Sequence, residues 1–277
     1  MTTATHPANP ELRLHRVLGE DTRPARRPGA LSTSVTLGWR ALVKIKRSPG
    51  QMFNATITPV MFTLIFTYLF GGAISGTARE YLQFLLPGIL VQGVLFISTQ
   101  TAVALTTDLQ QGVFDRFRSL PIWRPSPLTG ALIGDLVRYA ISSVVVVAVG
   151  LALGFRPHGG ALGVIGGILL AMLFGFCVSW VWTLLGLVLR TPQAVSALGM
   201  LLLSLLTFAS NIFVMPATMP GWLKAFVDIN PIGHVVTATR DLMSDGGTSE
   251  LGPALLSCAV LLVVFVPLSV LKYNKSE

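Results

Sequence analysis

Long apolar runs separated by short polar stretches dominate the pattern of this chain. A helix that rises ~1.5 Å per residue needs about 20 apolar residues to cross a ~30 Å hydrocarbon layer. Six runs meet this requirement, and the alternating segments typical of a membrane-spanning barrel are missing. The pattern predicts an all-α integral membrane protein with six transmembrane helices. We expect the spans at about residues 54–73, 81–107, 128–154, 161–189, 194–213 and 251–271, in a transmembrane domain covering 54–271.

The stretch before the first run divides into two parts. Residues 1–33 are rich in Pro, Ala, Thr and Arg and are predicted to be a disordered cytoplasmic tail. Residues 34–53 place apolar side chains on one helical face and cations on another, which indicates an amphipathic interfacial helix. A solvated basic segment beside the membrane is the alternative. The residues expected at the membrane surface are Trp39, Arg40, Lys44 and Arg47.

The polar stretch between the fifth and sixth runs, at about residues 215–250, mixes apolar residues with proline breaks. This predicts two short amphipathic helices, at about 220–227 and 232–243, separated by the dipeptide Asn230-Pro231. We expect both helices on the extracellular face, dipping into the membrane or lying on it.

Composition and charge agree with a membrane protein. Hydrophobic residues make up 52% of the chain and charged residues 12%, against about 25% charged residues in ordinary soluble domains. The net charge of +8 could suggest nucleic acid, but the basic residues lie at the ends of apolar runs, so membrane topology explains them and no nucleic acid is expected. The cytoplasmic side would hold Arg40, Lys44, Lys46, Arg47, Arg116, Arg118, Arg124, Arg190, Lys272 and Lys275, and the outside Arg79, Arg156, Lys224 and Arg240.

This asymmetry predicts a multi-pass protein of the plasma membrane with both termini in the cytoplasm, including a cytoplasmic C-terminus at residues 272–277. Inside the fourth run, small residues recur every four positions, a stripe that permits close helix packing within the subunit. The stripe consists of Gly159, Gly163, Gly167, Ala171 and Gly175.

A short charged segment at about residues 108–127 lies between the second and third runs and is predicted to be a cytoplasmic docking helix. Its apolar side chains recur every three residues, its charges point elsewhere, and a proline ends the pattern. The candidate contact residues are Phe114, Asp115, Arg116, Phe117, Arg118, Leu120 and Pro121.

The sequence contains few motifs typical of catalysis or cofactor binding. It has no GxxxxGK[ST] phosphate loop, and its histidines and cysteines are scattered or lie inside apolar runs, so we expect no nucleotide, metal or catalytic site. Asp135 and Arg138 are three residues apart and can pair on one helical face; a satisfied anchoring pair and a proton relay are both open. Because intramembrane carboxylates are scarce, energy from a partner is favoured over energy from an ion gradient.

Three stretches carry a family resemblance: YLQFLLPGILVQ, FDRFRSLPIWRPSP and FVMPATMPGWLKAFVDINPIGHVVTATRDL. In this order they resemble type-2 ATP-binding-cassette exporter permeases, especially the membrane subunits of daunorubicin and doxorubicin resistance exporters. The resemblance covers roughly residues 39–272. It implies a homodimer in the membrane lipid, bound to two separate cytoplasmic ATPase subunits that would hold ATP and Mg²⁺.

The resemblance further implies that the segment at 108–127 is the coupling helix that docks on the ATPase, and that the second and fifth spans border the path of a small amphipathic substrate. The polar or aromatic candidates in those spans are Gln92, Thr99, Gln100, Thr207, Phe208 and Asn211. The chain is thus expected to be a drug or antibiotic efflux permease that is not itself an enzyme. Export of a lipid or lipid-linked glycan, and a non-transporting membrane anchor or immunity protein, remain alternatives.

Overall fold

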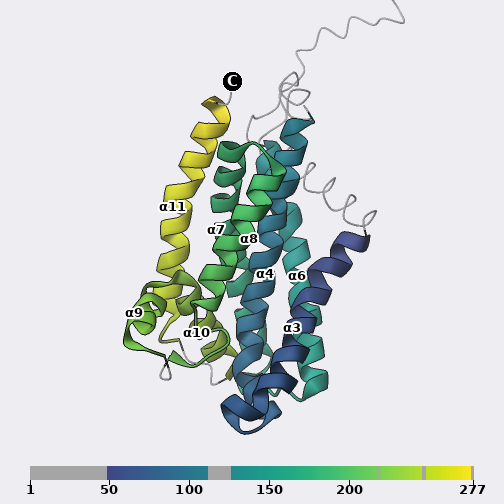
Figure 1. The fold of residues 1–277 in the computed structure, drawn as a ribbon, viewed down its shortest axis with the longest axis vertical. Coiled ribbons are helices and arrows are strands. Elements are labelled where there is room, and N and C mark those ends of the chain that lie inside the picture. The colour runs from purple at the N-terminus through teal and green to yellow at the C-terminus, as the bar shows by residue number, and fades with distance from the viewer. Residues whose placement is uncertain (1–48, 112–125, 217–218, 245–247, 276–277) are drawn as a thin grey trace, which may run out of the picture.

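The computed structural model describes residues 49–111, 126–216, 219–244 and 248–275, and within these ranges the fold is entirely helical (Figure 1). The helices are α3 (Pro49–Ser75), α4 (Ala78–Gln110), α6 (Ser126–Leu153), α7 (Gly160–Leu189), α8 (Pro192–Phe208), α9 (Gly221–Ile229), α10 (Pro231–Ser244) and α11 (Leu251–Lys275). Among the described residues, α3, α4, α6, α7 and α11 are long and apolar enough to cross a membrane. The prediction of an all-helical, multi-pass membrane protein is therefore confirmed.

The fifth predicted span differs from expectation, because α8 ends at Phe208. The Asn230 side-chain amide donates hydrogen bonds of 2.9 Å to the carbonyl oxygens of Leu206 and Ala209, and so satisfies groups that a longer helix would have bonded internally. With 17 residues, α8 is about 26 Å long, slightly less than the ~30 Å hydrocarbon layer. A sixth crossing of the membrane therefore stays a prediction.

The central helix is α4, which packs against α3, α6, α7, α8 and α10. Its core side chains, such as Tyr81, Leu85 and Ile89, are fully buried. The flanking helices α3 and α11 expose apolar side chains such as Leu69 and Val263, as expected for surfaces that face lipid.

The bundle has two distinct ends (Figure 1). The end of α11, the turn between α7 and α8, and the residues on either side of the undescribed segment 112–125 share one end, which we call the C-terminal end. The short helices α9 and α10 lie at the opposite end, together with the turn between α3 and α4; we call this the α10 end.

Glycines of α7, together with Gly159 just before it, allow α10 to pack closely against α7. The Gly159 amide donates to the Met243 carbonyl oxygen at 3.0 Å, and a methyl group at Gly163 would collide with the Leu242 carbonyl oxygen. Farther along α7, a methyl group at Gly175 would collide with Val94 of α4. The stripe of small residues thus serves packing within the subunit, at α10 and at α4.

Candidate functional site

The six predicted path residues lie on the packed pair α4 and α8 and just beyond α8, but they do not share one surface. Gln92, Thr207 and Asn211 are buried, with exposed fractions between 1% and 4%. Gln100 and Phe208 are exposed, whereas the Thr99 hydroxyl donates at 2.7 Å to the Phe96 carbonyl oxygen of its own helix. The exposed and buried members of the set therefore face different surroundings.

The three buried path residues share one property. In the described part of the chain, Gln92 Oε1, Thr207 Oγ1 and Asn211 Oδ1 have no hydrogen-bond partner, although the Asn211 amide donates to the Thr237 hydroxyl at 2.7 Å. Buried polar atoms are normally paired, so each such atom requires an explanation. They are groups that a polar ligand or a rearranged neighbour could satisfy.

Sequence reasoning missed a cluster of phenylalanines that joins α3, α4 and the end of α8. Phe213 is its centre and stacks on Phe66 at 4.5 Å and on Phe208 at 5.3 Å between ring centres. These spacings fall in the range that aromatic pairs prefer. The aromatic cluster consists of Phe62, Phe66, Phe70, Phe96, Phe208 and Phe213. The recurrence of phenylalanine at every fourth position from 62 to 70 was the available signal.

The aromatic cluster reaches the outside of the subunit. Phe208 is 59% exposed and Phe70 is 39% exposed, whereas Phe213, which stacks on Phe66 and Phe208, is buried. Large exposed aromatic rings supported by a buried ring form a surface that can stack on a flat apolar molecule.

Arg240 of α10 joins this region to α4. Its Nε donates to the Phe84 carbonyl oxygen at 3.1 Å and its Nη2 to the Asn211 carbonyl oxygen at 3.0 Å. Burial lowers the pKa of the guanidinium to about 10, while the neighbouring Asp241 opposes that shift. Arg240 therefore stays charged at neutral pH and connects α10 both to α4 and to the stretch beyond α8.

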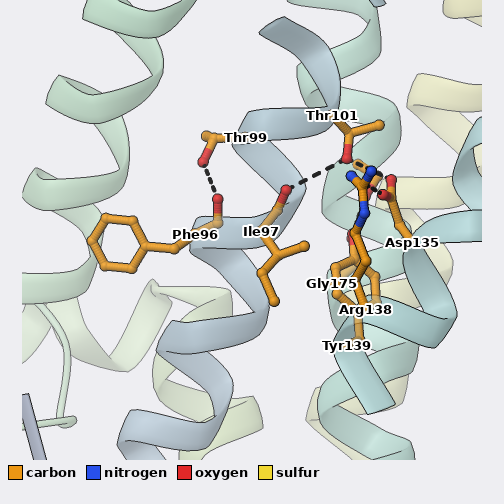
Figure 2. Close-up of polar contacts among 9 residues, drawn as sticks. Phe96, Ile97, Thr99, Thr101, Asp135, Arg138, Tyr139 and Gly175 are labelled. Carbon is orange, nitrogen blue, oxygen red and sulfur yellow. Dashed lines mark hydrogen bonds and ion pairs between the residues drawn. The ribbon is translucent and has the colours of Figure 1, made fainter. Parts of the chain in front are cut away.

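A second polar network lies deep between α4, α6 and α7 (Figure 2). Asp135 accepts from the Thr101 hydroxyl at 2.5 Å and from Arg138 Nη1 at 3.1 Å, so the predicted pairing of Asp135 with Arg138 is confirmed. The Tyr139 and Ser179 hydroxyl oxygens are 2.7 Å apart and link α6 to α7. Because both Asp135 carboxylate oxygens accept a hydrogen bond, one from Thr101 and one from Arg138, the geometry favours an anchoring role over a proton relay.

Two predicted sets lie outside the described residues: the coupling residues from Phe114 to Pro121, and the interfacial residues from Trp39 to Arg47. The tail at 1–33 is also outside. Their assigned roles stay predictions. The predicted extracellular helices at 220–227 and 232–243 correspond to α9 and α10.

The chain belongs to the ABC-2 type transporter family, whose family model matches residues 34–244. It is 46% identical over 275 residues to the daunorubicin resistance ABC transporter permease protein DrrB1 of Streptomyces coeruleorubidus, covering 99% of this chain and 96% of that protein. It is 32% identical to the doxorubicin resistance ABC transporter permease protein DrrB of Mycobacterium tuberculosis (strain ATCC 25618 / H37Rv), over 71% of each chain. The resemblance inferred from the three sequence stretches is confirmed.

Proposed function

We propose that this chain is the membrane subunit of an ATP-driven exporter whose cargo is an amphipathic molecule with a flat aromatic part, such as an anthracycline. The aromatic cluster is the observation that supports this cargo. Two of its rings, Phe70 and Phe208, are exposed, and stacking on such rings suits a planar apolar molecule. The names of the two drug-resistance relatives point to the same class of cargo.

The buried acceptors near α8 support an amphipathic rather than a purely apolar cargo. Gln92 Oε1 and Thr207 Oγ1 have no partner in the described part of the chain, on the helices that the family resemblance assigns to the path. A cargo that brings hydrogen-bond donors could satisfy them when α4 and α8 separate. A lipid with a long alkyl chain would gain less from stacked rings.

Energy would come from two copies of a separate ATPase subunit, which would bind ATP with Mg²⁺ and dock on the cytoplasmic segment at about 108–127 of two copies of this chain. The absence of a phosphate loop from the sequence and membership of the ABC-2 family support this arrangement. The asymmetry of Lys and Arg along the sequence supports a plasma-membrane orientation in which the C-terminal end and both termini face the cytoplasm.

The test has two stages. Affinity purification in mild detergent, followed by mass spectrometry, is expected to recover a subunit with a phosphate-binding loop. The recovered complex is then placed in inside-out vesicles, and ATP-dependent uptake of fluorescent doxorubicin is measured. An assembled complex that hydrolyses ATP without moving doxorubicin would favour export of a lipid or lipid-linked glycan. Failure to recover an ATPase, while a known exporter is recovered in parallel, would favour a membrane anchor.

A further inference from the structure

Two helices carry the segment that connects this chain to its proposed ATPase. Helix α4 ends at Gln110 and α6 begins at Ser126, both at the C-terminal end of the bundle (Figure 1). Thr101 and Asp135 lie about nine residues inside these two helix ends, which corresponds to about 14 Å along each helix. The contact between their side chains therefore lies at the same distance from the segment along α4 and along α6.

This contact is sealed from solvent. The Thr101 hydroxyl donates to Asp135 Oδ2 at 2.5 Å, and Arg138 Nη1 donates to Asp135 Oδ1 at 3.1 Å (Figure 2). Only 2% of Asp135 is exposed. A hydrogen bond to an ionised group in a low-dielectric interior is stronger than one between neutral groups in water.

The same face of α6 is also held to α7. The Tyr139 and Ser179 hydroxyl oxygens are 2.7 Å apart, and Ser179 donates in turn to the Gly175 carbonyl oxygen at 2.8 Å. Tyr139 itself is fully buried. Asp135 and Tyr139 thus bind α6 to two different helices from one face, one helical turn apart.

The geometry excludes Asp135 as a counter-ion for cationic cargo in this conformation. Both of its carboxylate oxygens already accept a hydrogen bond, and Asp135 is almost completely buried. The group is instead placed to hold helices together.

We propose that Thr101 and Asp135 form a clamp that makes α4 and α6 move as one body, so that displacement of the predicted coupling segment at about 108–127 by the ATPase reaches the cargo path. This inference rests on the proposed function. Helix α4 carries Gln92 and Phe96 on the other side of the clamp from the segment. Without the clamp, the paired ends of α4 and α6 can separate, and the displacement is absorbed there before it reaches those residues. Thr101 and Asp135 are positioning residues, because the coupling between two sites depends on the packed elements that join them.

The decisive variant is Thr101→Val, which keeps the shape of the side chain and leaves Asp135 paired with Arg138. The matched control is Thr107→Val, because within the described ranges the Thr107 hydroxyl donates at 2.8 Å to the Val103 carbonyl oxygen of its own helix and to no other helix. In vesicles that contain the full complex, we expect Thr101→Val to lower doxorubicin moved per ATP hydrolysed by about tenfold, within the range of mutational effects on coupling. Co-purification of the ATPase should stay unchanged.

An independent experiment replaces the clamp by a covalent bond. In a background with Cys177→Ser and Cys258→Ser, the pair Thr101→Cys and Asp135→Cys is expected to be uncoupled when reduced. Diamide would then take two hydrogens from the two thiols, forming a disulfide and the corresponding hydrazine. Transport per ATP should recover with the disulfide and fall again after dithiothreitol. A disulfide that forms without restoring transport, or thiols that never cross-link in the assembled complex, would contradict the clamp.

Different results would overturn the proposed export function and the proposed clamp. A wild-type complex that moves no doxorubicin overturns the proposed function. A wild-type complex that moves doxorubicin, and a Thr101→Val complex with the same transport per ATP, overturns the clamp alone. If the protein with the cysteine pair does not assemble with the ATPase, the comparison of wild type with Thr101→Val still tests the clamp.

Discussion

The guanidinium carbon of Arg240 lies 3.8 Å from the centre of the Phe84 ring, so α10 is attached to α4 by stacking as well as by hydrogen bonds. The same guanidinium donates to the carbonyl oxygens of Phe84 and Asn211. A cation over an aromatic ring contributes about 0.5–2 kcal/mol, more when the pair is desolvated. Arg240 therefore determines how α10 sits against α4 and against the stretch that follows α8.

Replacing Arg240 should weaken the attachment of α10 to α4. Arg240→Gln removes the charge and shortens the reach to the two carbonyl oxygens, and we expect a loss of about 2 kcal/mol in the free energy of unfolding. Thermal unfolding of the purified protein in detergent should shift downward by about 4–8 °C. Lys224→Gln on α9 is the control, since Lys224 is exposed and its loss should leave the melting temperature nearly unchanged. Equal melting temperatures for the two variants would contradict the assigned role.

The close approach of α7 and α10 allows a comparison of two glycines on one helix. Gly163→Ala would push a methyl group into the Leu242 carbonyl oxygen, and backbone at that position cannot move aside easily, so we expect a loss of about 1–3 kcal/mol. Gly166→Ala would meet a Leu242 methyl carbon at 3.7 Å, an ordinary contact. This control should be neutral or stabilising by up to about 1 kcal/mol, because alanine has a higher helix propensity than glycine. Chemical denaturation in detergent compares the two, and equal stabilities would show that the contact between α7 and α10 tolerates a side chain.

The exposed ring of Phe208 tests the cargo. Phe208→Ala should weaken the apparent affinity for doxorubicin by about two- to tenfold, the effect of losing one aromatic stacking partner. Leu205→Ala is the matched control, because Leu205 lies on the same helix and is also 59% exposed. Stimulation of ATP hydrolysis by doxorubicin in the purified complex measures both variants. Indistinguishable stimulation curves for wild type and Phe208→Ala would remove the aromatic cluster from the cargo path.

The predicted coupling segment gives a test that depends on the sequence alone. Phe117→Ala or Arg118→Ala should weaken association with the ATPase subunit by removing an apolar or a charged contact of the docking helix. Membrane insertion should remain intact. Co-purification measures the association, and the amount of protein in the membrane fraction serves as the control. Undiminished recovery of the ATPase from both variants would place the docking site elsewhere in the chain.

Local patterns predicted much of the helical layout. The helices α4, α7 and α11 begin and end within a few residues of the expected spans, because their bounds depend on hydrophobic runs and on Gly and Pro at the ends. The pairing of Asp135 with Arg138 was also predictable, since residues three apart on a helix are neighbours. The early end of α8 was not, because Asn230, which bonds the carbonyl oxygens there, lies more than twenty residues away.

The polar path candidates illustrate a different limit. Gln92 and Gln100 are similar side chains on the same helix, yet Gln92 is buried and Gln100 is exposed. Sequence could place both in a span but could not say which face of α4 meets α8. The aromatic cluster was missed for the same reason, because Phe213 reaches Phe62 and Phe66 only after the chain has folded back.

Sequence by itself determined that this chain is a helical membrane protein, roughly where its long helices lie, and to which transporter family it belongs. These properties follow from hydrophobic length and from short local motifs. Tertiary structure decided that Arg240, counted in the sequence as an outward cation, is packed against Phe84, and that Thr101 meets Asp135 between α4 and α6. The physical reason is that burial and hydrogen bonding join residues distant along the chain, and only packing brings them within a few ångströms of one another.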